Sequence, residues 1–105
     1  MKAISLVTLV LSAAFSANAF AAGDYYTICN SCTPFGQNQP AVRAAAVSAA
    51  QAHSAVVGDS IGVCKDIGMT NETLYYTVNT APVTQSSNLT FTTSFFTDGA
   101  CEDWI

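Results

Sequence analysis

Residues 40–52 read PAVRAAAVSAAQA, and this Ala-rich stretch decides the fold class. Within it the apolar residues recur at helical spacing, and after it they alternate with polar ones as in strands. Alanine is the best helix former, and proline suits the first helical turn, where no amide donor is needed. Asn38 or Gln39 can cap the start, and Gly58 stops the run. The stretch is therefore predicted to be a helix. Its thin apolar stripe consists of Val42, Ala45, Ala46, Ala49, Ala52 and Val56.

Beyond Gly58, apolar residues alternate with polar ones, as they do in half-buried β-strands. The last of these alternating stretches is the clearest, because it is rich in β-branched and aromatic residues, and it is expected to place Leu89, Phe91 and Phe95 on one face. We predict strands over residues 61–67, 74–79 and 88–97, with a turn over 68–72 and a loop over 81–87.

The simplest assembly of these elements is an α+β fold, in which one Ala-rich helix packs on a three-stranded antiparallel sheet. The β-prone residues 24–28 can add a fourth strand at an edge. One face of the sheet would carry apolar side chains such as Leu74, Tyr76 and Val78, and the other would face solvent. These patterns leave the order of the strands open.

The first 21 residues have the features of a cleaved signal peptide. Lys2 gives a positive start, residues 3–15 are apolar with only small hydroxyl interruptions, and Ala19-Phe20-Ala21 offers the small-x-small pattern of a signal-peptidase site. The apolar run is shorter than the ~20 residues that a membrane-spanning helix needs. We expect cleavage after Ala21, or alternatively after Ala19, and a single small secreted domain over residues 22–105. The short leader with one lysine favours a Gram-negative periplasm or the surrounding medium.

The charge balance argues against two classes of partner. Without Lys2 the chain keeps two basic residues against seven acidic ones, which is a net charge of −5. Nucleic acids and anionic lipids both require basic patches on the protein that binds them. Neither is therefore expected as a partner, and no membrane span is expected once the leader is removed.

Four cysteines, Cys29, Cys32, Cys64 and Cys101, are expected to form disulfides in an oxidising compartment. They allow three pairings. We favour Cys29–Cys32 with Cys64–Cys101, because close neighbours meet easily and the second bridge would pin the C-terminal tail to a strand. Closing that longer loop contributes ~4 kcal/mol on the chain-entropy estimate. The two pairings that join Cys29 to Cys64 or to Cys101 stay open.

The C-x-x-C spacing of Cys29 and Cys32 also occurs in thiol–disulfide enzymes. Such chemistry needs a thiolate of low pKa, usually at a helix N-terminus. The predicted helix begins about eight residues after Cys32, so that position is not met. A Cys₄ zinc site would need a second close pair, and Cys64 and Cys101 are far apart. A structural bridge is the leading interpretation, with redox exchange as the alternative.

No catalytic, cofactor or metal site is predicted. His53 is the single histidine, and it falls at the predicted helix C-terminus, where exposed carbonyls favour a cation. No Ser or Cys nucleophile with an orienting carboxylate can be named around it. Glu102 and Asp103 are adjacent in the tail, so they cannot flank a substrate as acid and base must.

Aromatic residues provide the candidate binding surface. Adjacent side chains on a strand point to opposite faces, so Tyr75 and Phe96 are expected to be exposed together as a contact patch. The leading hypothesis is a non-enzymatic exported protein that binds a protein partner or self-associates, at a sheet edge or at this patch. The alternatives are thiol–disulfide exchange at Cys29 and Cys32, and a small secreted inhibitor or toxin.

Two segments, Asn71-Glu72-Thr73 and Asn88-Leu89-Thr90, match the acceptor pattern for N-glycosylation. In a bacterial chain with so many threonines we attribute both matches to chance.

Overall fold

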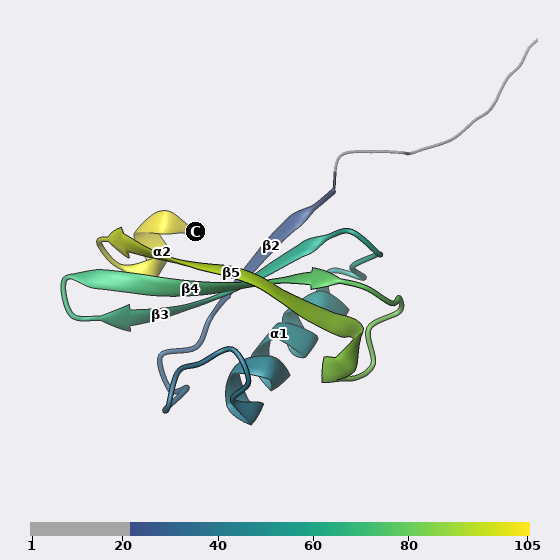
Figure 1. The fold of residues 1–105 in the computed structure, drawn as a ribbon. Coiled ribbons are helices and arrows are strands. Elements are labelled where there is room, and N and C mark those ends of the chain that lie inside the picture. Colours follow the sequence, from purple (N-terminus) through teal and green to yellow (C-terminus); the bar gives the residue numbers. More distant parts are fainter. Residues whose placement is uncertain (1–21) are drawn as a thin grey trace, which may run out of the picture.

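The computed structural model describes residues 22–105, and the expected leader over residues 1–21 lies outside this range. Figure 1 shows the arrangement of the elements. In chain order they are β2 (Asp24–Ile28), α1 (Pro40–Ala52), β3 (Ser60–Ile67), β4 (Thr70–Val78), the short 3₁₀ turn η2 (Ser86–Asn88), β5 (Leu89–Asp98) and α2 (Cys101–Trp104). The predicted Ala-rich helix is confirmed.

The four strands form one sheet in the order β2-β3-β4-β5. The α+β class and the fourth strand are confirmed, but the expectation of a purely antiparallel sheet is wrong. β3, β4 and β5 pair antiparallel, whereas β2 pairs parallel with β3. The reason is the helix itself, because α1 lies between β2 and β3 in the chain and brings it back in the same direction, as a crossover connection does.

One face of the sheet packs against α1 (Figure 1). The helix contributes small buried side chains at Val42, Ala46, Ala49 and Ala50, so its backbone can lie close to the strands. The expected apolar face of β4 is confirmed. The sheet side of this core consists of Ile61, Val63, Leu74, Tyr76, Val78 and Leu89.

The opposite face of the sheet was predicted to face solvent, but it is partly covered. The C-terminal residues that were expected to be a tail form α2, which lies on this face at the end of the sheet away from α1 (Figure 1). The disulfide Cys64–Cys101 fastens α2 to β3. Asp66 Oδ1 accepts a 2.7 Å hydrogen bond from the Cys101 N–H, which fixes the start of α2.

The β3–β4 turn is shorter than predicted, because β4 already begins at Thr70. Only Gly68 and Met69 lie between the two strands, and Gly68 has the positive φ of 87° that such tight hairpins favour. Asn71 is disfavoured in strands by propensity. Here its side chain is buried, and Nδ2 donates to the Gly99 carbonyl at 2.9 Å. That tertiary contact outweighs the local preference.

A β-bulge changes the faces of β5. Tyr76 pairs with Phe91 while Tyr75 pairs with Thr93, so Thr92 has no partner on β4. Leu89 and Phe91 pack toward α1, as predicted. The prediction for Phe95 is wrong, because the extra residue moves it to the opposite face.

Candidate interaction surface at the β5 edge

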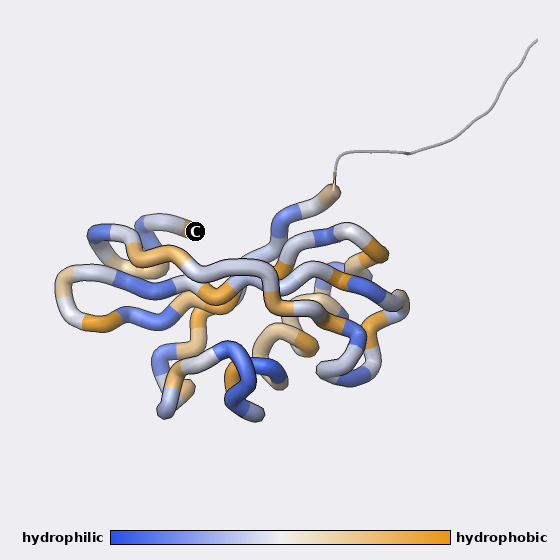
Figure 2. Tube along the Cα trace, in the orientation of Figure 1, coloured by the Kyte–Doolittle hydropathy of each residue, from blue (hydrophilic) through white to orange (hydrophobic). Residues whose placement is uncertain are grey.

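β5 is an edge strand of the sheet. It pairs with β4 on one side, and no other strand of residues 22–105 pairs with its second side. Its ten residues, LTFTTSFFTD, contain no proline and no charge before Asp98. Figure 2 accordingly shows pale and orange tones along β5 between its ends. Natural edges are usually protected by lysine, proline, bulges or a covering element, so β5 is unusual in how little charge it carries.

The start of β5 does have such protection. Arg43, on α1, donates from Nη1 to the carbonyls of Leu89 and Ser86, each at 3.1 Å. The same guanidinium lies 5.1 Å from the ring centroid of Tyr76, within the range of a cation–π contact. Downstream, Thr92 forms the bulge, and its hydroxyl donates to the Tyr75 carbonyl at 3.1 Å. Residues Thr93–Thr97 have neither a covering side chain nor a bulge, and we call this stretch the open edge.

Four rings form an aromatic cluster on the α2 face beside the open edge: Tyr26, Tyr75, Phe95 and Trp104. Edge-to-face contacts join Tyr26 to Trp104 at 5.1 Å, Tyr26 to Tyr75 at 6.0 Å and Tyr75 to Phe95 at 5.7 Å between centroids. Such pairs contribute about 0.5–1.5 kcal/mol each beyond their burial.

The cluster closes over a glycine in β3. A Cβ at Gly62 would lie 2.7 Å from Tyr26 Cδ1, so a larger residue there would displace the ring. Phe95 is 55% exposed at the margin of the cluster. The cluster therefore continues the packed α2 face to the sheet edge.

Tyr75 and Phe96 do not share a face. Phe96 pairs with Glu72 on the face that α1 partly covers, whereas Tyr75 belongs to the aromatic cluster. Phe96 is 67% exposed, but Tyr75 is half-buried. A binding role for either residue stays a prediction. Sequence reasoning missed Phe95 because the bulge has no sequence signal that could have revealed the exchange of faces. It missed Trp104 because the C-terminal residues were expected to be a tail and not the helix α2.

Burial is the main influence on two ionisable groups near the open edge. It raises the pKa of the Tyr75 hydroxyl above its usual range, with smaller contributions from a hydrogen bond and charge interaction with Tyr26 and from the charge of Asp24. Burial also raises the pKa of Glu72, which lies opposite Phe96 in the register. The Tyr75 hydroxyl is therefore neutral at physiological pH and can act only as a neutral hydrogen-bonding group.

The disulfides have the favoured pairing, Cys29–Cys32 and Cys64–Cys101, with Cα atoms 5.4 and 5.9 Å apart. Cys32 is 1% exposed and belongs to the core on the α1 face. α1 begins only at Pro40, so its N-terminus is not adjacent to the C-x-x-C motif in sequence.

His53 is the C-cap residue that follows α1, and its ring stacks on Tyr25 with centroids 4.4 Å apart. This contact gives the histidine a packing partner at the end of the helix. No group of three metal-ligating side chains occurs within residues 22–105.

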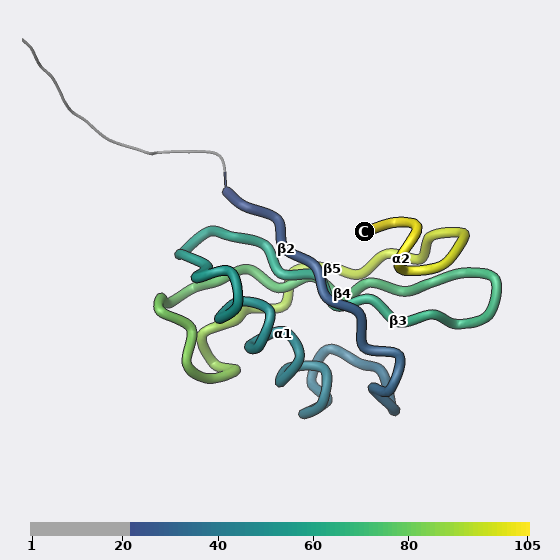
Figure 3. The backbone as a smooth tube through the Cα atoms, turned by 180° about the vertical axis from the view of Figure 1, so that it is seen from behind, coloured from purple at the N-terminus to yellow at the C-terminus, as the bar shows by residue number. Residues whose placement is uncertain are grey.

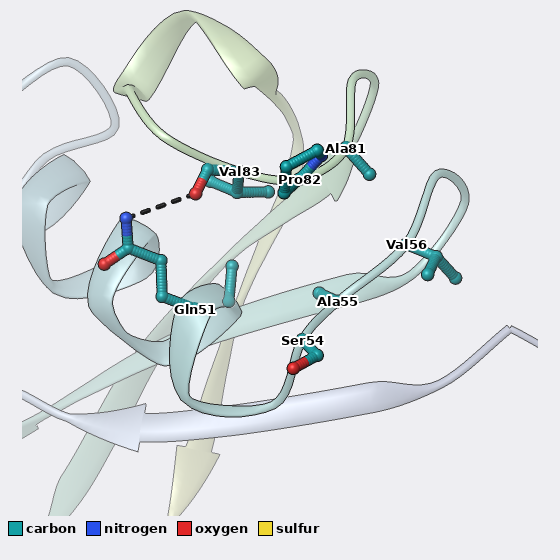
Figure 4. Close-up of a pocket in the computed structure, with 8 residues that line it drawn as sticks. Gln51, Ser54, Ala55, Val56, Ala81, Pro82 and Val83 are labelled. Carbon is teal, nitrogen blue, oxygen red and sulfur yellow. Dashed lines mark hydrogen bonds between the residues drawn. The ribbon is translucent and has the colours of Figure 1, made fainter.

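A shallow pocket of about 460 Å³ lies between the end of α1 and the loop after β4 (Figure 4). Ala55, Pro82 and Val83 are among its apolar lining residues. Its one amide side chain, Gln51, donates from Nε2 to the Val83 carbonyl at 3.1 Å. The pocket brings together no charged group, and Gln51 and Ser54 are the polar side chains in an otherwise apolar lining.

Both acceptor patterns for glycosylation lie on buried asparagines. Asn71 is 0% exposed and Asn88 is 8% exposed. Asn88 Oδ1 accepts hydrogen bonds from the amides of Thr84 and Gln85 at 3.0 and 3.2 Å, which closes the loop before β5. In the folded domain both side chains serve packing and loop closure.

Comparisons with protein-family models, with curated proteins and with solved structures find no match for this chain. Within residues 22–105, none of the helices has the length and apolar character that crossing a membrane requires.

Proposed function

We propose that the protein is a small exported, non-enzymatic module that acts through protein contacts along the open edge Thr93–Thr97. The observation that carries this proposal is the ten-residue strand β5, unpaired on one side and uncharged before Asp98. An unpaired strand presents a row of backbone donors and acceptors to which another chain can add a strand.

The other edge of the sheet is a weaker candidate. β2 has five residues and begins with the charged Asp24. Figure 3, viewed from behind, brings β2 to the front, and the strand order places it at the edge away from β5. The open edge is equally long but carries no charge, whereas the carboxylate of Asp24 disfavours an added strand at β2, as charged residues do on natural sheet edges.

Export is supported by two features of the chain. The signal-peptide pattern of residues 1–21 predicts it, and both disulfides are compatible with an oxidising compartment outside the cytoplasm. Disulfides also suit a domain of this size, because a small core leaves little stability to spare.

Sedimentation of the domain over residues 22–105 tests the proposal, alone and with extracts of the source organism. The double variant Phe95→Lys/Phe96→Lys places a charge on each face of the open edge, and we expect it to lose self-association and partner capture together. Val56→Lys/Val57→Lys is the matched control, because these exposed valines lie in the loop after α1. Circular dichroism and disulfide content should be unchanged in both variants.

Retained association in a folded Phe95→Lys/Phe96→Lys variant would contradict the proposal. The rival function, thiol–disulfide exchange at Cys29 and Cys32, predicts the reverse pattern. Its activity would survive the lysine substitutions and disappear in Cys29→Ser/Cys32→Ser.

A further inference from the structure

The open edge can pair with the open edge of a second copy favourably only when the two strands run antiparallel. Asp98 is the one charged residue of β5. If two copies met in parallel and in register, the two Asp98 carboxylates would lie side by side, and like charges placed opposite one another destabilise a sheet. In an antiparallel arrangement the two carboxylates lie at opposite ends of the paired strands.

The side-chain sizes select a register within the antiparallel arrangement. With Phe95 at the centre, Thr93 of one copy faces Thr97 of the other, and Ser94 faces Phe96. Each large ring on the Phe96 face then meets a small hydroxyl side chain. Threonine pairs are favourable cross-strand neighbours, and aromatic pairs are too.

The same register continues the aromatic cluster across the joint. Phe95 contacts Tyr75 edge-to-face at 5.7 Å and is 55% exposed. The partner's Phe95 would cover that exposed ring and extend the row of rings from Tyr26 and Tyr75 into the second copy. Phe96, which is 67% exposed, would lose water contact at the same time.

We propose, building on the function proposed above, that the occupant of the open edge is a second copy of this chain, paired antiparallel about Phe95. The two four-stranded sheets then join into one continuous sheet with two-fold symmetry. Five residues a side form a smaller contact than a standard interface, so the dimer is expected to be weak and reversible.

The charge of the chain gives the dimer a distinctive salt dependence. Residues 22–105 carry seven acidic and two basic groups, so two copies repel each other at low ionic strength. Added salt screens that repulsion and should strengthen the dimer. A basic partner held by charge attraction would show the opposite trend, because salt would weaken it.

Cysteine cross-linking of the domain over residues 22–105, with its native disulfides intact, tests the register. Phe95→Cys places two thiols opposite each other, with Cα atoms about 4.5–5.5 Å apart. We expect mild oxidation to give a covalent dimer in high yield. Thr93→Cys and Thr97→Cys are matched controls, because each would lie about 14 Å from its own copy, beyond the ~7 Å limit for a disulfide.

Mixing Thr93→Cys with Thr97→Cys should restore cross-linking as a covalent heterodimer. This mixture also keeps the test decisive if Phe95→Cys fails to fold. Equal yields at all three positions, or no cross-link in either Phe95→Cys or the mixture, would overturn the inference. So would a wild-type domain that stays monomeric at ~1 mM in high salt.

Failure of this inference is distinguishable from failure of the proposed function. If partner capture is lost in Phe95→Lys/Phe96→Lys while no cross-link forms, the open edge binds a different chain. If capture and association both survive those substitutions, the proposed function itself is wrong.

Discussion

Thr73 carries a buried hydroxyl that the fold leaves without a partner. The residue is 0% exposed, and its Oγ1 has no hydrogen bond within residues 22–105. Leaving a buried polar group unsatisfied costs about 1–3 kcal/mol. Replacing it with a methyl group of the same shape therefore removes a cost without opening a cavity.

We predict that Thr73→Val raises the free energy of unfolding by about 1 kcal/mol. Urea denaturation with intact disulfides measures the change. Thr92→Val is the control, because its hydroxyl does hydrogen-bond, to the Tyr75 carbonyl, and no gain is expected there. A loss of stability in Thr73→Val would mean that the hydroxyl has a partner after all.

The two disulfides hold different elements and should differ in effect. Cys29 and Cys32 are 3 residues apart in the sequence, so their bridge closes a short loop in the β2–α1 connection. Cys64 and Cys101 are 37 residues apart, so their bridge closes a long loop, and it also holds α2 to the sheet. On the chain-entropy estimate the short loop contributes about 2 kcal/mol and the long one about 4.

We predict that Cys64→Ala/Cys101→Ala lowers the free energy of unfolding by about twice as much as Cys29→Ala/Cys32→Ala. It should also expose the Trp104 ring, because α2 loses its covalent attachment to β3. Thermal unfolding followed by tryptophan fluorescence reports both effects. A larger loss for the Cys29/Cys32 pair would contradict this division of roles.

Local patterns predicted the elements better than their arrangement. The helix over 40–52 followed from alanine content and spacing, and the apolar face of Leu74, Tyr76 and Val78 followed from alternation. The parallel β2–β3 pair follows from the chain order strand–helix–strand, in which α1 returns the chain in the same direction, and the prediction of an antiparallel sheet did not take this order into account. The bulge at Thr92 could not be predicted either. The alternating pattern assumes that every residue of a strand has a partner, so it cannot identify the residue that has none.

At the scale of the whole molecule, the two helices cover opposite faces at opposite ends of the sheet, and β5 borders both faces (Figure 1). The hypothesis of a sheet edge or aromatic patch came from the predicted strands and their adjacent aromatic residues, but its position depends on the fold. Tyr75 was identified from its neighbours in the sequence. Phe95 and Trp104 join it only because the bulge and the Cys64–Cys101 bridge bring them to the same face.

Hydrogen–deuterium exchange of the domain over residues 22–105, followed residue by residue at rising protein concentration, tests most directly whether the open edge is the contact surface. We predict that amides within Thr93–Thr97 exchange more slowly as concentration and salt increase, while those of β2 (Asp24–Ile28) keep their rates. Protection that develops in β2, or rates in Thr93–Thr97 that do not change while the molecular mass rises, would contradict the account.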